Sequence, residues 1–384
     1  MKIKQLPQDF IVEEILNYTL VAEGDYKIYR LKKIGLETFS LIKQISYQNR
    51  IQLKDIGYCG IKDRHAITIQ YISIPKTSTI KYLRGDNYEL QYLGYIKEPL
   101  KTGDLEENKF TIVVRDLEEN EITTFEEMFP YVSKNGFINY FDSQRFGSFD
   151  KETGSFVARA VVAQDYELAV KLFFKTQYSE KAKGNFYKLL SELLKDWNKF
   201  GKLKLDIDYV MSLQAEYRET QSWKSTYQVI PVKLREIFLM AYQSYLWNEA
   251  VKLLLEKQKC EFETVSNTVG EVYFLTTPTT DLPQTFPLVG RKFEPTELEK
   301  EITDVLLARE NITYDQIKEV SKSGSFLKSY PRAITILPKN FEVSQYAKDE
   351  YAMQKGKKRQ KVQLTFTLPK GVYATCLVKA LFLE

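Results

Sequence analysis

One carboxylate stands between two cations in residues 58–70, the segment best suited to chemistry. Asp63 is flanked by Lys62 and Arg64 and follows Gly60, directly ahead of an alternating strand. A lone aspartate on such a turn can act as a nucleophile or base when neighbouring cations keep it ionised. The same cations could attract a phosphate backbone. The alternative is a solvated hairpin tip, because Lys-Asp-Arg is also a common surface string.

The residue inventory excludes most familiar catalytic centres. With a single histidine, His65, catalytic triads are available only if that residue is the base. The three cysteines are far apart and show neither metal nor redox spacing, which indicates reduced thiols. Neither a Walker loop nor a Gly-x-Gly-x-x-Gly turn is present in the sequence. We therefore expect no metal and no cofactor, and catalysis by carboxylates, lysines, tyrosines or arginines.

A second cluster, residues 139–147, mixes aromatic rings with amide and cationic side chains. Asn139, Phe141 and Arg145 belong to it. This mixture suits a single-stranded or flipped base that stacks on a ring and is read by an amide. A sheet edge that packs its aromatic side chains into a core would give the same string.

Length and charge limit the architecture and the partners. A chain of 384 residues predicts two domains. A net charge of +4 permits a nucleic-acid partner without requiring one. The basic run at 355–361 would attract phosphates, with a solvated loop as the alternative. The N-terminus lacks a signal-peptide core and no apolar run approaches the roughly 18 residues of a membrane helix, so we expect a soluble cytoplasmic protein.

The order of elements predicts a sheet domain with an insertion. We expect a helix N-capped by Thr38, and strands at 9–13, 26–31, 67–71 and 110–115. Beyond about residue 160, helical spacing is seen at 167–175, 186–197 and 232–257. The apolar stripe of the last helix includes Ile237 and Trp247. Alternation returns at 361–368, so this strand would complete the sheet that the first 150 residues begin.

Four ordered motifs resemble the signature of the TruD family of tRNA pseudouridine synthases. The segment 60–70 around Asp63 is the most similar, and the other three are residues 7–14, 139–147 and 368–375. The helical segment 242–248 also resembles the family. Together the matches span nearly the whole chain.

The resemblance implies an α+β fold and an RNA isomerase. A pseudouridine synthase catalytic domain with a mixed or antiparallel sheet would comprise residues 1–158 and 331–384. A largely helical α/β insertion domain, specific to the family, would comprise residues 159–330. The implied reaction is the isomerisation of uridine 13 of tRNA to pseudouridine, without a cofactor.

The resemblance also assigns roles to individual residues. Asp63 would be the catalytic aspartate, and Phe141 would stack on the target base. Asn139 would help to hold the active-site loop or the base, and Lys4 matches a lysine near the acid. The candidates for contacts with RNA phosphates are Lys62, Arg64 and Arg145.

One loop departs from the family, and two other functions stay open. Glu106 and Glu107 stand where Lys-Gly is usual, so the loop lacks a cation and a flexible glycine. We expect tRNA as the partner of a monomer, with no membrane. The residues also permit a non-catalytic RNA-binding or RNA-folding protein of the same fold and, more remotely, a carboxylate-dependent glycosidase or nucleosidase.

Overall fold

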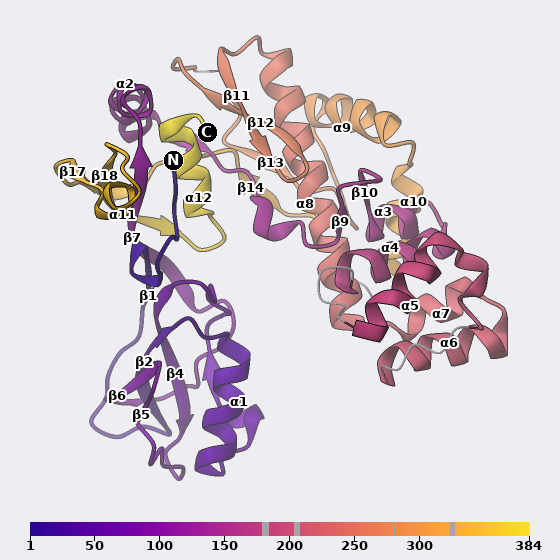
Figure 1. The fold of residues 1–384 in the computed structure, drawn as a ribbon, viewed down its shortest axis with the longest axis horizontal. Coiled ribbons are helices and arrows are strands. Elements are labelled where there is room, and N and C mark those ends of the chain that lie inside the picture. The colour runs from indigo at the N-terminus through magenta and orange to yellow at the C-terminus, as the bar shows by residue number, and fades with distance from the viewer. Residues whose placement is uncertain (179–183, 203–207, 280, 323–326) are drawn as a thin grey trace. The chain divides into compact units, whose positions relative to one another are not determined.

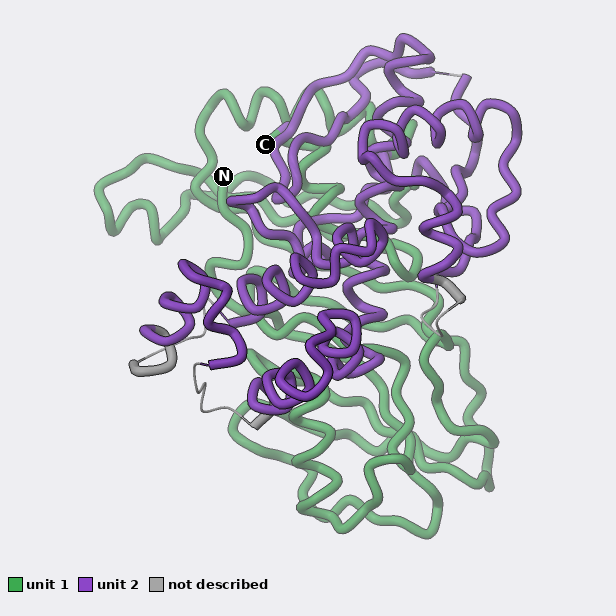
Figure 2. Tube along the Cα trace, turned by 90° about the vertical axis from the view of Figure 1, so that its right-hand side faces the viewer, with its two compact units in different colours: residues 1–136, 336–382, 384 green, residues 137–335, 383 purple. Residues whose placement is uncertain are grey.

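The computed structural model describes residues 1–178, 184–202, 208–279, 281–322 and 327–384 (Figure 1). The chain divides into two compact units, coloured separately in Figure 2. Unit 1 comprises residues 1–136, 336–382 and 384, and unit 2 comprises residues 137–335 and 383. Which residues constitute a family-specific insertion stays a prediction.

Unit 1 is built on a ten-stranded sheet in the order β16-β18-β7-β1-β4-β2-β6-β5, with β17 paired to β18 and β3 to β4. The β1 and β4 strands run parallel and the other pairs antiparallel, so the sheet is mixed and the fold is α+β. The strands are β1 (Phe10–Leu16), β2 (Tyr26–Ile34), β3 (Gly57–Tyr58), β4 (Ile67–Pro75), β5 (Arg84–Gly85), β6 (Tyr88–Ile96), β7 (Leu105–Leu117), β16 (Lys339–Val343), β17 (Ala347–Lys348) and β18 (Gln360–Pro369).

The expected closing strand is confirmed. The β18 strand pairs with β7, and Leu364 lies opposite Ile112. Phe110, Ile112 and Val114 are all buried on β7, as their alternation predicts. The C-terminal part of unit 1 therefore continues a sheet that its N-terminal part begins.

The β4 strand is buried on both faces, although its alternation predicts one buried face. Thr68 and Gln70 are as inaccessible as Ile67 and Ile69. The reason is that α1 (Thr38–Asn49) covers one face of β4, where Leu41, Ile42 and Ile45 pack in a common core with Ile72 and Ile74. The other face meets a second apolar cluster through Tyr71.

The cap of α1 is Glu37 and not Thr38 as predicted. The Glu37 carboxylate accepts hydrogen bonds from the backbone N–H groups of Phe39 and Ser40. Thr38 is instead the first helical residue, and its buried hydroxyl is used elsewhere. The other helices of unit 1 are α2 (Glu119–Asn135), α11 (Glu350–Gln354) and α12 (Ala374–Phe382).

Unit 2 is largely helical and is organised around one long helix, α8 (Val232–Lys257), which has the predicted bounds. Ile237 is 51% exposed, so the predicted stripe is wrong at this position. From Phe238 onward α8 is buried on most sides, which a narrow stripe does not describe. The other helices are α3 (Val157–Val162), α4 (Tyr166–Tyr178), α5 (Gly184–Lys195), α6 (Asp208–Thr220), α7 (Trp223–Val229), α9 (Glu297–Arg309) and α10 (Tyr314–Lys322).

The strands of unit 2 are short and pair in small ladders. They are β8 (Phe137–Ile138), β9 (Phe149–Asp150), β10 (Ser155–Phe156), β11 (Phe262–Asn267), β12 (Gly270–Leu275), β13 (Thr285–Pro287) and β14 (Pro331–Ala333), and β15 (Thr335–Ile336) lies where the chain leaves the unit. Across the described ranges of both units, we find no helix with the length and apolar character needed to cross a membrane.

Candidate active site

Asp63 lies in unit 1, on the loop between β3 and β4, and its carboxylate forms an ion pair with the ammonium of Lys4. The two side chains are only 17% and 16% exposed. Lys4 has a φ of 58°, and its Nζ lies 4.2 Å from the centroid of the Phe10 ring. The other carboxylate oxygen of Asp63, Oδ1, accepts a 2.9 Å hydrogen bond from the backbone N–H of His65. The expected acid and lysine are therefore together.

A second lysine beneath the loop was missed by the sequence analysis. Lys33 is fully buried, and its Nζ donates to the carbonyl oxygens of Leu36 (2.8 Å) and Asp63 (3.0 Å). Burial lowers the pKa of Lys33 to about 8, although the charges of Asp63 and Glu37 oppose this shift. Strand alternation could have identified this residue. Side chains two positions apart on a strand point to the same face, and Lys33 follows the buried Tyr29 and Leu31 at this spacing.

A buried ion pair fixes the residue before Asp63. Lys62 Nζ lies 2.8 Å from Glu14 Oε1, with the two side chains 9% and 0% exposed. The backbone N–H of Lys62 also donates to the Thr38 hydroxyl at 3.1 Å. The Lys62 ammonium is thus already paired with Glu14. Its contact with an RNA phosphate stays a prediction, and that contact would require the ion pair to break.

Glu13 and Glu14 point to opposite faces of β1, as expected for neighbours on a strand. Glu13 pairs with Arg30 at 3.1 Å on a partly exposed surface. Glu14 belongs to the network below Asp63, a role that its adjacency to Glu13 did not indicate. Its second oxygen accepts a 3.0 Å hydrogen bond from the backbone N–H of Tyr71.

The residues around Asp63 include one exposed cation and one inert thiol. Arg64 is exposed, and no carboxylate of the described residues lies within ion-pairing distance of it, so its phosphate contact stays a prediction. Cys59 is buried, and burial raises the pKa of its thiol to about 12. A thiol with that pKa is almost wholly protonated near neutral pH and is a poor nucleophile.

The second predicted cluster lies in unit 2. The side-chain amide of Asn139 donates to the Ala333 carbonyl at 3.0 Å, and its Oδ1 accepts from Arg332 Nη2 at 2.7 Å. The guanidinium carbon of Arg332 lies 3.9 Å from the centroid of the Phe141 ring. Arg332 was not predicted, because it is 193 positions from Asn139 and no motif marks it.

The α8 helix holds the backbone and one face of this cluster. Asn248 bonds reciprocally with Phe141, accepting from its N–H at 2.9 Å and donating to its carbonyl at 2.8 Å. Trp247 meets the Phe141 ring edge to face, with centroids 5.8 Å apart. Arg145 Nε donates to the Ser244 hydroxyl at 3.1 Å. The helical segment that resembles the family is thus the support of the 139–147 motif.

The predicted site residues therefore form two groups. Lys4, Lys62, Arg64 and Asp63 are in unit 1, whereas Asn139, Phe141 and Arg145 are in unit 2. The atypical loop at Glu106 and Glu107 is in unit 1, where Lys339 Nζ lies 2.6 Å from Glu107 Oε1. A lysine of β16 thereby pairs with the acidic residue that replaces the usual sequence.

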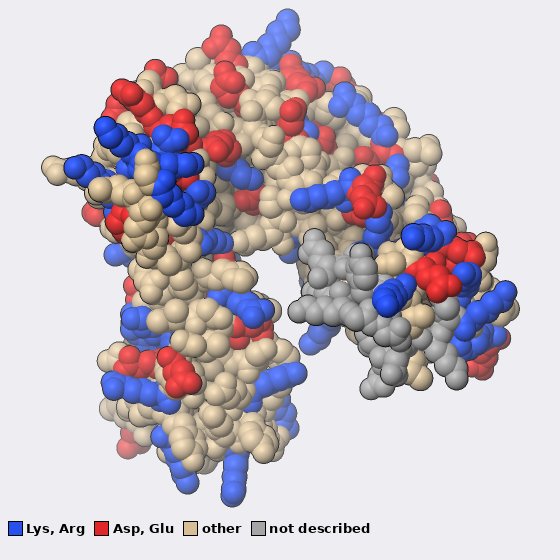
Figure 3. Space-filling model, in the orientation of Figure 1, with Lys and Arg blue, Asp and Glu red and all other residues tan. Residues whose placement is uncertain are grey.

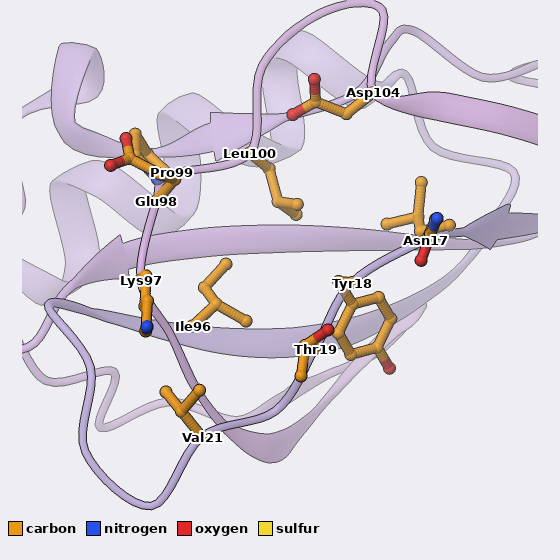
Figure 4. Close-up of a pocket in the computed structure, with 11 residues that line it drawn as sticks. Asn17, Tyr18, Thr19, Val21, Ile96, Lys97, Glu98, Pro99, Leu100 and Asp104 are labelled. Atoms are coloured by element: carbon orange, nitrogen blue, oxygen red, sulfur yellow. The ribbon is translucent and has the colours of Figure 1, made fainter.

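Two other kinds of site, a metal centre and a surface hollow, were considered in the described residues. Among the residues with described positions, no three His, Cys, Asp or Glu side chains are grouped as metal ligands. A hollow of about 470 Å³ in unit 1 is lined by residues 16–19, 21, 96–100 and 104 (Figure 4). It lies beyond the C-terminal end of β1, whereas Lys4 precedes that strand. Neither Asp63 nor Lys4 lines it.

Comparisons with known proteins agree on one family. The model of the family tRNA pseudouridine synthase D (TruD) matches residues 1–381. A protein of Methanocaldococcus jannaschii named for this family is 36% identical over the whole of this chain and 92% of its own. The tRNA pseudouridine synthase D of Leptospira interrogans is 31% identical over the whole chain and 96% of its own.

A solved structure agrees with the fold. The crystal structure of a protein from Methanosarcina mazei titled as TruD superposes with a TM-score of 0.71 and 25% identity, covering all of this chain and 93% of that one. The sequence resemblance is therefore confirmed by independent comparisons of sequence and of structure. The chain belongs to the tRNA pseudouridine synthase D family, and pseudouridine synthases are isomerases.

Proposed function

We propose that this chain converts uridine 13 of tRNA to pseudouridine, with Asp63 as the catalytic carboxylate and no cofactor. The observation that carries the proposal is the Asp63 site. A largely buried carboxylate is paired with Lys4, and the carbonyl of the same residue is held by Lys33. Buried charge clusters of this kind are typical of functional sites. Membership of the family supports the class of reaction and the tRNA substrate.

The reaction needs an ionised carboxylate and little else. The C1′–N1 bond of uridine breaks, the uracil turns, and C1′ joins C5, after which C5 loses a proton and N1 carries one. Asp63 would either attack C1′ or take a proton from the ribose. The Lys4 ammonium beside it would keep the carboxylate ionised and steady negative charge on the departing uracil.

The target nucleotide must also leave the helical stack, which costs a few kcal/mol. We assign Phe141 to stack on the base, which could return about 1–3 kcal/mol. Asn139 is committed to Ala333 and Arg332, so its contacts favour holding the loop over reading the base. Arg64 and Arg145 are our candidates for phosphate contacts. Acting on tRNA would place the protein in the cytoplasm, and we expect a monomer.

The test uses purified protein and a tRNA transcript, without added metal or cofactor. We expect pseudouridine at position 13 and no product when that uridine is replaced by cytidine. Asp63→Asn should lower the rate by at least about 10²-fold while leaving tRNA binding largely intact. Asp86→Asn is the matched control, since Asp86 is an exposed aspartate of the same unit.

Three outcomes would overturn the proposal. Affinity for tRNA without any product would indicate a non-catalytic RNA-binding protein. Release of free uracil would indicate a nucleosidase, because an isomerase retains every atom of its substrate. Full activity of Asp63→Asn would show that another group supplies the carboxylate chemistry.

A further inference from the structure

The excess positive charge of the chain is concentrated in one short segment of unit 1. Residues 347–361 form β17, α11 and the start of β18, and we call them the β17–β18 hairpin. They include six basic and two acidic residues, an excess of four. The whole chain has 55 basic and 51 acidic residues, which is the same excess. Outside the hairpin, basic and acidic residues are therefore equal in number.

Some cations of the hairpin are neutralised by nearby carboxylates. Arg359 forms ion pairs with Asp116 and Glu118. Lys361 Nζ lies 2.6 Å from Glu350 Oε2, and this hydrogen bond is the main reason that the pKa of Glu350 falls to about 2. Arg359 and Lys361 are therefore neutralised by carboxylates of the same unit and contribute little to attracting a charged partner.

Four lysines remain exposed on the hairpin: Lys348, Lys355, Lys357 and Lys358. Within the described parts of the chain, no carboxylate lies at ion-pairing distance from any of them. Figure 3 shows lysine and arginine side chains gathered over β17, β18 and α11. The excess charge is thus a surface patch of lysines that form no ion pair with a described carboxylate. Asp116 is nevertheless close enough to feel it, because the pKa of Asp116 is lowered mainly by the hydrogen bond from Lys2 and in part by the charge of Lys357.

The turn that carries three of these lysines is closed by backbone hydrogen bonds. Gly356 has a φ of 72°, a conformation that glycine adopts without strain. Its N–H donates to the Met353 carbonyl at 2.9 Å, and the N–H of Lys357 donates to the Ala352 carbonyl at 3.0 Å. Because these hydrogen bonds close α11, they hold the backbone of the turn that carries the lysines, which limits the backbone entropy lost on binding.

We propose that the β17–β18 hairpin is a docking surface for the phosphate backbone of tRNA, separate from the turn that carries Asp63. The proposal rests on the proposed function, which supplies the RNA partner. Exposed lysines that form no ion pair within the protein bind a polyanion by releasing its counterions. A lipid surface fits less well, because Met353 is the one large apolar side chain of the hairpin that is well exposed, too few for an interfacial anchor.

The test is a triple variant with a matched control. Lys355→Gln, Lys357→Gln and Lys358→Gln together should reduce the slope of log affinity for tRNA against log salt by up to about 3. KM should rise, whereas the rate at saturating tRNA should be unchanged. The control combines Lys54→Gln, Lys81→Gln and Lys97→Gln, which removes the same charge from exposed lysines of the same unit. Its salt slope should stay close to that of the wild type.

The outcomes separate this proposal from the proposed function. An unchanged salt slope in the hairpin variant, or an equal loss in the control, would overturn the docking surface. So would loss of binding to phosphatidylserine vesicles with no effect on tRNA. If the wild type makes no pseudouridine, the proposed function fails, but the two salt slopes still decide whether the hairpin binds RNA.

Discussion

The side chains of Lys4 and Asp63, 59 positions apart in the sequence, form an ion pair in unit 1. Lys4 enters this contact from the segment before β1, with its ammonium also near the Phe10 ring. The pair is largely shielded from water, so its interaction is stronger than that of an exposed pair.

Replacing Lys4 should therefore slow the chemical step. We expect Lys4→Met to lower the single-turnover rate on tRNA by about 10²-fold, the scale of losing one preorganised charge partner. Lys4→Arg should recover part of the rate because it keeps the charge. Lys76→Met is the control, since Lys76 pairs with Asp25 at an exposed position. An equal loss in both methionine variants would contradict a specific role for Lys4.

Lys33 makes stability depend on pH in a defined direction. Its folded-state pKa is about 8, against an ordinary value of 10.5, so between these values the unfolded chain binds more protons. Stability from this group therefore rises with pH across that window, by on the order of 3 kcal/mol. Chemical unfolding of the wild type and of Lys33→Met, at pH 8 and at pH 10.5, checks this. The wild type should gain on the variant at the higher pH, and a constant difference would refute the shift.

Arg332 and Phe141 should be energetically coupled. The guanidinium lies over the ring, so a double-mutant cycle with Arg332→Met and Phe141→Leu should give a coupling of about 1 kcal/mol in the free energy of unfolding. Arg145 offers a control, since its guanidinium carbon is 5.8 Å from the same ring centroid and should couple more weakly. Equal couplings would show that the stacked arrangement contributes nothing specific.

The cysteines should differ in reactivity. Burial raises the pKa of both Cys59 and Cys260, but Cys260 is partly exposed whereas Cys59 and Cys376 are buried. We expect iodoacetamide at neutral pH to label Cys260 first, and the other two only after unfolding. Peptide mass spectrometry measures the order. Rapid native labelling of Cys59, with loss of activity, would indicate an accessible thiol beside the Asp63 loop.

Local sequence patterns were sufficient to predict several helices and strands. The bounds of α8 and the strand that became β18 follow from periodicity, which depends on neighbouring residues alone. The order of elements also predicted that this strand completes the sheet of the first 150 residues, but it did not identify β7 as the partner strand. The Lys4–Asp63 contact was expected through the family resemblance and not through spacing.

Long-range pairing explains what was missed. Arg332 contacts Asn139, 193 positions away, and Glu14 of β1 pairs with Lys62 of the loop between β3 and β4. Such contacts depend on the topology, which local spacing does not contain. The cap of α1 was misplaced by one residue because Thr38 and Glu37 can both accept from backbone N–H groups, and the fold uses the Thr38 hydroxyl for Lys62.

The pairing of β7 with β18 has a consequence for biosynthesis. Residues 137–335, nearly all of unit 2, are translated between these two strands, so β7 leaves the ribosome long before β18 does. Until then β7 presents an unpaired edge, the kind of surface that aggregates. A message cut short within unit 2 would encode Asp63 and Lys4 on an unfinished sheet. Ribosomal arrest in that interval would therefore yield a product that carries the acid but not its complete scaffold.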